Sequence, residues 1–435
     1  MMPRVMLRMG DRAHEPAGST ATGGSASARS GEPSLKALQL ALLKTTEVLA
    51  NELERPTAIA PEWSPTEWSV ARAVASIHGV SPLLAGALQW RGPADWTQFL
   101  AQQKAHTAKR FCRIQQLLQL IDGVARSEGI ALVALKGAAL HASGVYAAGE
   151  RPMADVDLLV RDAESQRAAR LLMELGFRGI MQDHRSSTFQ EAAAAAPAAL
   201  GEHSDNSIQI DLHYRIAEQL PLRAVDISEI VLPVQLHPGL NTYASKAALL
   251  IHLLLHAAGA LTCRALRLLQ LHDIGRLARS MTDAEWDQVF HEGERTADAS
   301  LWWVFPPLLL ATRYCRGVPD RVLARAASHC HWLLKCVYRD KTLSSASLSY
   351  LWISAFPGIE WARSPREMLQ YAATRIVPSA QTVQLRTTLA GVQPLLSGGS
   401  WANLSQGRRV LRWLMSRQAR HETLQPVSAA FRAPY

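Results

Sequence analysis

The sequence lacks a long uninterrupted apolar run, and this lack argues against a membrane-spanning helix. A spanning helix needs about 20 consecutive apolar residues, but the most apolar stretch, residues 247–261, is interrupted by His252 and His256. The mean hydropathy of the chain is −0.02. Hydrophobic residues still form 48% of the 435 residues, which is enough for a buried core and for two or three domains.

Cysteines are few and follow no motif spacing. The five cysteines are Cys112, Cys263, Cys315, Cys330 and Cys336. An odd number without a C-x-x-C pair is typical of reduced thiols in a cytosol and argues against a disulfide framework. The first residues include Asp11 and Glu15 and lack the apolar segment of a secretory signal. We therefore expect a cytoplasmic protein.

Acidic residues are outnumbered by basic ones, which gives a formal net charge of +9. This balance suits an anionic ligand such as a nucleotide, or nucleic acid, and it also fits an arginine-rich genome. A basic helix is expected over residues 408–420, and a solvated face explains its arginines better than a phosphate-binding surface does. Nucleic acid is therefore not the favoured partner.

Residues 132–146 predict a strand, a turn and a short helix. Leu132, Val133 and Leu135 form an apolar run that stops at Lys136-Gly137, as a buried strand would. A short helix is expected over residues 138–146, and it would be ended by the following Gly149. Glycine at the turn allows a phosphate to approach the backbone closely.

A second strand, DVDLLV, is predicted over residues 155–160. Residues two apart on a strand face the same way, so Asp155 and Asp157 project together, about 7 Å apart along the backbone. Two like charges so placed repel each other unless a cation lies between them. Mg²⁺, which prefers oxygen ligands, is the cation that such a pair suits.

A third acid lies on another predicted strand, residues 207–215. Apolar and polar residues alternate there, so Asp211 shares one face with Gln209 and His213. If this strand lies beside the second one, Asp211 meets Asp155 and Asp157 in a three-carboxylate metal site. The competing interpretation is that these acids cap strand ends or pair with arginines.

Composition and periodicity predict an α+β fold, in which a small mixed β-sheet core is flanked by N-terminal and C-terminal helical bundles. The predicted parts are a disordered extension (1–34), an N-terminal helical region (35–128), a catalytic core (129–220), a C-terminal helical domain (221–379) and a basic, partly flexible tail (380–435). Thr66 is expected to cap a helix, Phe177–Met181 to form a strand, and the chain after Pro221 to be mostly helical.

These motifs resemble an uncharacterised bacterial nucleotidyltransferase family within the DNA polymerase beta-like superfamily, which also contains the aminoglycoside nucleotidyltransferases. The resemblance covers roughly residues 40–290. It rests on LKGAAL, Tyr146, Arg151, DVDLLV, IDLHYRI, an upstream segment that ends in H-G-V-x-P-L-L, and a later H-x-x-x-H…D-I segment. The resemblance implies a nucleotidyltransferase core and a two-metal reaction.

The implied reaction moves a nucleoside monophosphate from an NTP, with ATP as the default donor, to a hydroxyl of an unidentified small-molecule, peptide or protein acceptor. Asp155, Asp157 and Asp211 are then the catalytic residues and the ligands of Mg²⁺. A non-catalytic nucleotide-binding protein is the competing interpretation, and the three intact acids argue against it.

Four residues are the expected nucleotide-binding groups: Lys136, Gly137, Ala138 and Arg151. Each has a structural alternative as well. Lys136 either touches phosphate or pairs with one of the acids, and Arg151 either binds the triphosphate or forms a structural salt bridge. Gly137 either admits a phosphate or makes an ordinary tight turn. His213 either supports a ligand or is a half-buried imidazole.

The rival enzyme class is a metal-dependent HD-type phosphohydrolase. His252 and His256 are spaced i, i+4 on one helix face, as metal ligands often are, and His272-Asp273 follows on the next helix. The ordinary interpretation is that these histidines pack and hydrogen-bond between helices. Asp273 would then pair with Arg264 or Arg276.

Overall fold

The computed structural model describes residues 33–192, 200–294, 301–377, 405–415 and 417–432. Contacts divide the chain into Met1–Ser34 and Leu35–Tyr435, and the second unit holds all the elements described below. The expected disordered extension therefore lies almost wholly outside the described residues, as does the first part of the expected basic tail. The domain boundaries expected within the second unit stay predictions.

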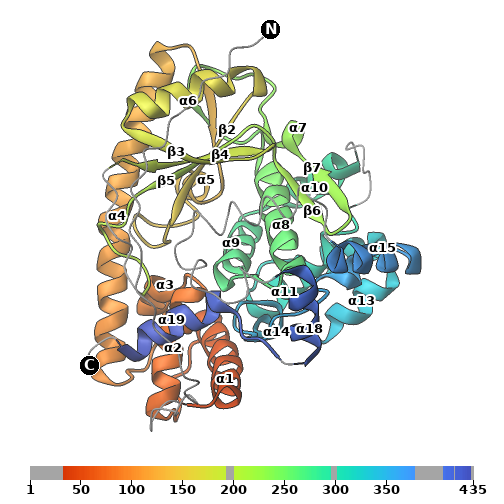
Figure 1. Cartoon of the computed structure of the whole chain (residues 1–435). Helices are drawn as coiled ribbons and strands as arrows, with labels where there is room; N and C mark the ends of the chain where they lie inside the picture. The colour runs from red at the N-terminus through yellow and green to blue at the C-terminus, as the bar shows by residue number, and fades with distance from the viewer. Residues whose placement is uncertain (1–32, 193–199, 295–300, 378–404, 416, 433–435) are drawn as a thin grey trace, which may run out of the picture. The chain divides into compact units, whose positions relative to one another are not determined.

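A six-stranded mixed sheet carries the predicted acids, and the α+β prediction is confirmed (Figure 1). Its strand order is β3-β4-β5-β2-β1-β8. The strands are β1 (Ala131–Ala134), β2 (Asp155–Val160), β3 (Phe177–Gln182), β4 (Ser186–Glu191), β5 (Gln209–His213) and β8 (Gly239–Asn241). Strand β2 is antiparallel to β1 and parallel to β5. A separate hairpin consists of β6 (Ala217–Leu220) and β7 (Arg223–Asp226).

Strand β2 runs from solvent into the core, because only its first residue is polar and exposed. Alternate side chains then enter two apolar clusters. Leu158 packs with Ile114 of α4 (Ala94–Ser127) and Leu171 of α6 (Ser165–Glu174). Leu159 belongs to the larger cluster formed with the other helices. Since both faces are covered, the strand is fixed in register, with Asp155 at its exposed end and Asp157 buried.

Four helices precede the sheet: α1 (Leu35–Glu54), α2 (Pro65–Ile77), α3 (Ser81–Ala87) and α4. The expected cap at Thr66 is wrong, because Ser64 caps α2. The Ser64 side chain accepts from the Glu67 N–H, and the Glu67 carboxylate accepts from the Ser64 N–H, a capping box with Pro65 at the first helical position. Helix α4 is one continuous helix alongside the sheet (Figure 1).

The remaining elements are helices and 3₁₀ turns. They are α5 (Lys136–Ala142, which precedes β2), the 3₁₀ turn η1 (Asp162–Glu164), α7 (Ser228–Val231), α8 (Lys246–Thr262), α9 (Leu268–Arg279), α10 (Asp283–Glu294), α11 (Phe305–Tyr314), α12 (Asp320–His329), α13 (Trp332–Arg339), α14 (Leu343–Ala346), the 3₁₀ turn η2 (Ile359–Trp361), α15 (Pro365–Ile376), α18 (Gln406–Met415) and α19 (His421–Arg432). Helix α19 packs against α2 (Figure 1), and buried Arg72 donates to the Ala430 carbonyl at 2.8 Å.

The strand expected at Phe177–Met181 is confirmed, but β4, β6, β7 and β8 are not predicted from the sequence. Strand β4 has the sequence SSTFQE, whose polar residues resemble a loop. Strand β8 has three residues and takes its place only by pairing with β1. Among the described residues no single helix has the length and apolarity to cross a membrane. Helices α2 and α3 meet those criteria only as a pair, bent by 112°.

Candidate active site

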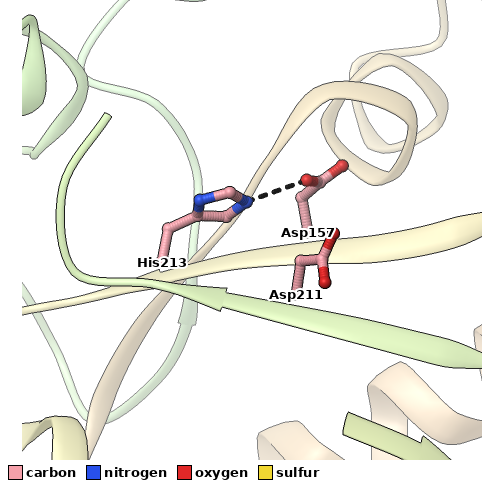
Figure 2. A group of neighbouring side chains, drawn as sticks. All are labelled: Asp157, Asp211 and His213. Carbon is pink, nitrogen blue, oxygen red and sulfur yellow. Dashed lines mark hydrogen bonds and ion pairs between the residues drawn. The ribbon is translucent and has the colours of Figure 1, made fainter. Parts of the chain in front are cut away.

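The register between β2 and β5 brings two of the predicted acids together. Asp157 and Asp211 are direct partners across the parallel strands, and their side chains lie next to each other (Figure 2). Asp155, two residues earlier on β2, is the partner of Gln209 and lies at the exposed start of the strand. The structure thus places Asp211 beside Asp157, as the sequence predicts, but among the described residues the cluster of candidate metal ligands contains Asp157, Asp211 and His213 and not Asp155.

Asp157 is buried, with 6% of the side chain exposed, and two groups contact one of its oxygens. Lys136 Nζ donates to Oδ1 at 2.7 Å, and His213 Nε2 donates to the same atom at 3.0 Å. Burial opposes the charge of Asp157, but Lys136 and His213 outweigh it and hold the pKa of this carboxyl well below its usual range. Asp157 is therefore ionised at neutral pH.

Asp155 is in the opposite situation. Desolvation by the surrounding chain and the nearby charge of Asp157 raise the pKa of Asp155 above its ordinary value, although its side chain stays open to solvent. The pKa values of Asp155 and Asp157 are thus shifted in opposite directions, and a cation between the two carboxylates would relieve their repulsion.

Asp211 is held by a neutral neighbour on the other side of β5. Thr188 of β4 is its antiparallel partner, and the Thr188 hydroxyl donates to Asp211 Oδ1 at 2.7 Å. Ligand atoms of Asp157, Asp211 and His213 lie within 4.8 Å of one another. The two interpretations of His213 are therefore compatible. Its imidazole is half-buried against Asp157, and it lies close enough to Asp157 and Asp211 to support a metal ligand.

The turn between β1 and α5 is under backbone constraint. Lys136 has a φ of 43°, in the region that residues other than glycine rarely adopt. Its N–H donates to the Tyr243 hydroxyl at 3.1 Å, and that hydroxyl lies 2.7 Å from His252 Nδ1. Burial lowers the pKa of His252 well below its usual range, so Tyr243 donates to a neutral imidazole. His252, which the phosphohydrolase interpretation assigns to a metal, thus supports the turn at Lys136 through Tyr243.

Gly137 permits a close approach to its backbone, but the groups that approach are side chains of the protein and not a phosphate. A Cβ at this position would lie 2.5 Å from Arg151 Nη1 and 3.0 Å from Met153 Cγ. The next N–H, that of Ala138, donates to the Leu135 carbonyl at 3.1 Å. The helix expected at residues 138–146 starts two residues earlier, at Lys136, and ends at Ala142.

Arg151 forms the structural salt bridge that was its alternative interpretation. Its Nε and Nη2 atoms donate to the two oxygens of Asp273 at 2.8 and 2.7 Å, and both side chains are buried. Tyr146 also donates to Asp273, at 2.8 Å. Burial opposes the charge of Arg151, but Asp273 outweighs it and raises the arginine's pKa. The partner is therefore a residue of α9, and not one of the three acids.

The histidines of the phosphohydrolase interpretation are not assembled into one site. His252 contacts Tyr243, His256 lies 3.9 Å from Glu218, and His272 contacts the Tyr146 hydroxyl at 2.8 Å. Among the described residues, the cluster of candidate metal ligands is that of Asp157, Asp211 and His213. The expected partners of Asp273 are also wrong: it pairs with Arg151, while Arg276 pairs with Glu150.

A cavity of about 740 Å³ opens beside the acids. Asp155, Asp157, Lys136 and Gly137 line one side, and segments far away in sequence line the rest. These segments include Arg267, just before α9, and Glu422 of α19. Sequence reasoning missed Thr188, Arg267 and Glu422, because no local motif marks them. Only the alternation of β4 against β5, once paired, could have indicated Thr188.

A mixed sheet with acids on two adjacent strands beside a cavity is the arrangement expected of a nucleotidyltransferase core. The family described as uncharacterised nucleotidyltransferase matches residues 64–316. Because this match covers more than half of the 435 residues, the chain belongs to that family. No curated protein and no solved structure matches the chain.

Proposed function

We propose that the protein transfers a nucleoside monophosphate from an NTP, with ATP as the default donor, to a hydroxyl of an acceptor, in a reaction that requires Mg²⁺. The observation that carries the proposal is the pairing of Asp157 with Asp211 across β2 and β5, with Asp155 on the same face of β2 at the mouth of the cavity. The acceptor class stays open among small molecules, peptides and proteins.

The donor set fits a hard divalent cation. Asp155, Asp157 and Asp211 offer carboxylate oxygens, which Mg²⁺ prefers. The ammonium group of Lys136 lies 2.7 Å from Asp157, so the Asp157 carboxylate already stabilises one positive charge. The single ion pair of Lys136 is with Asp157, and among the described residues Asp155 and Asp211 form no ion pair. When bound by the three acids, Mg²⁺ would neutralise phosphate charge and activate the acceptor oxygen.

The acidic side chains of the site have separate roles in the proposed reaction. Asp211, oriented by Thr188, is the group we assign to the proton of the acceptor hydroxyl. The acceptor oxygen forms a bond to the α-phosphorus, the bond from that phosphorus to the bridging oxygen breaks, and pyrophosphate leaves. Asp157 is held ionised by Lys136 and His213, so it is ready to bind a cation.

Pyrophosphate release tests this proposal. Each of four NTPs with Mg²⁺ is incubated with a library of hydroxyl-bearing acceptors, and pyrophosphate and orthophosphate are measured separately. A transferase releases pyrophosphate only with an acceptor, a phosphohydrolase releases orthophosphate or a monophosphate product, and a binding protein releases neither. Asp157→Asn and Asp211→Asn should abolish the pyrophosphate signal. A wild-type protein that binds no Mg²⁺–NTP in calorimetry would contradict the proposal.

A further inference from the structure

The proposed reaction needs a cation for the triphosphate, and two cations that line the cavity with the acids, Lys136 and Arg151, are already paired. Lys136 is bonded to Asp157, and Arg151 is bonded through two atoms to Asp273. Releasing Arg151 would leave a buried carboxylate without its partner, which is costly. The phosphates therefore require a positive group that is not part of these two ion pairs.

Arg267 is such a group. It lines the same cavity as Asp155 and Lys136, and its side chain is exposed. Among the residues that the structure describes, Arg267 forms no ion pair with an acidic side chain. Asp155 and Glu202 line the same cavity as Arg267. An arginine so placed can bind phosphate oxygens through two parallel hydrogen bonds.

The backbone of Arg267 is fixed on both sides by hydrogen bonds. Its own N–H donates to Gln270 Oε1 at 2.8 Å. The next two amides are held by a single histidine: the Leu268 N–H donates to His78 Nδ1 at 3.0 Å, and the Leu269 N–H donates to the His78 carbonyl at 3.2 Å. A fixed backbone at Arg267 limits the loss of entropy on binding to that of the side chain.

His78 is the first residue of the H-G-V-x-P-L-L segment, whose role the sequence alone does not define. Burial lowers the pKa of His78 to about 3, so the ring is neutral. With Nδ1 as an acceptor, Nε2 carries the proton and donates to Ser349 Oγ at 3.0 Å. This segment thus anchors the start of α9. Because His78 occupies the first amides of α9, the helix terminus does not offer them to a phosphate, and the guanidinium is the group left to meet it.

We propose that Arg267, and not Arg151, binds the phosphate groups of the nucleotide, a role that rests on the proposed function. The test uses Arg267→Gln, Arg267→Lys and the control Arg170→Gln, which removes one exposed positive charge from α6, outside the cavity. Calorimetry measures the affinity of each full-length protein for the NTP that the wild type binds most tightly and for inorganic tripolyphosphate, both with Mg²⁺.

Arg267→Gln should lower the affinity for both ligands about ten- to one-hundredfold, the loss expected for hydrogen bonds to charged groups. Arg267→Lys should recover part of that loss, and Arg170→Gln should bind as the wild type does. Melting temperatures without ligand should be equal, because Arg267 is exposed. Wild-type affinity in Arg267→Gln for both ligands would overturn this role alone. Loss of NTP affinity with tripolyphosphate affinity intact would overturn it as well, because Arg267 would then contact the nucleoside. A wild type that binds no NTP overturns this role together with the proposed function.

Discussion

Asp157 and Asp211 are direct partners on adjacent strands, yet they are stabilised in different ways. Asp157 is bonded to Lys136 and His213, which offer positive charge and N–H groups. Asp211 accepts a hydrogen bond from the neutral Thr188, and among the described residues it forms no ion pair. Two acids of one site are therefore expected to respond differently to the same substitution.

Asp157→Asn should destabilise the metal-free protein by about 3 kcal/mol, because the half-buried Lys136 loses its partner. Asp211→Asn should leave that stability unchanged or slightly raised, because it removes one of several adjacent negative charges. Both variants should lose the thermal stabilisation that Mg²⁺–NTP gives the wild type. Thermal melts with and without ligand measure these effects. Equal melting of the two variants without ligand would contradict the asymmetry.

Thr188→Val should slow pyrophosphate release about tenfold, the effect of one lost hydrogen bond. Valine keeps the shape and favours a strand, so the fold should persist. Affinity for the nucleotide should change little, since the substitution alters only the orientation of Asp211. Ser187→Ala, one residue away on β4, is the control and should act as the wild type does. A lower nucleotide affinity in Thr188→Val with unchanged turnover would contradict the assignment.

Stability should fall as the pH drops from 6.5 towards 4. Burial lowers the pKa of His78 to about 3 and that of His272 to about 4, whereas both titrate near 6.5 in the unfolded chain. Below pH 6.5 the unfolded chain therefore binds protons that the folded chain does not. At pH 5 each histidine therefore lowers the free energy of unfolding by about 2 kcal/mol.

Urea unfolding at pH 7.5 and pH 5 measures this dependence. His272→Gln should lower stability at pH 7.5 through its contact with Tyr146 and should reduce the pH slope. His237→Gln, at an exposed position, should keep the wild-type slope. The depressed pKa of Asp157 acts in a separate window, because the stability it contributes is lost only below its usual range. A slope that is unchanged in His272→Gln would count against the buried-histidine explanation.

Gly137→Ala should destabilise the protein by about 1–3 kcal/mol, because the added methyl group meets Arg151 and Met153. Arg151 has little freedom to move, since Asp273 holds it at two atoms. The matched control is Gly123→Ala within α4, where a Cβ has no neighbour within 4 Å. That change should stabilise the protein by about 0.5–1 kcal/mol. Chemical unfolding measures both, and a stabilised Gly137→Ala would contradict the close approach.

The sequence predicts the acids well because their placement depends on local periodicity. The alternation around Asp211 and the D-x-D spacing each define a strand face, and two such faces can meet in only a few ways. The position of β5 beside β2 agrees with that reasoning. Short polar strands such as β8 are different, since pairing with β1 and not propensity determines them.

Local periodicity does not indicate side-chain partners that lie far apart in the sequence. Arg151 and Asp273 are separated by 122 positions, and nothing near either residue indicates the other. The capping error has a local cause instead. Ser64 and Thr66 are both good caps, and only the Glu67 side chain, three residues after Ser64, decides between them. The reach of Arg267 into the cavity likewise depends on how α2 and α9 meet through His78.

Helix α19 lines the cavity from outside the part of the chain that the family matches. The match ends at residue 316, yet Glu422 and Gln425 of α19 line the same cavity as Asp155 and Asp157. Under the proposed function, substitutions on this helix should alter which acceptor fits while every acid keeps its place. A laboratory selection for new acceptors would therefore do best to randomise α19 first, and to leave the sheet untouched.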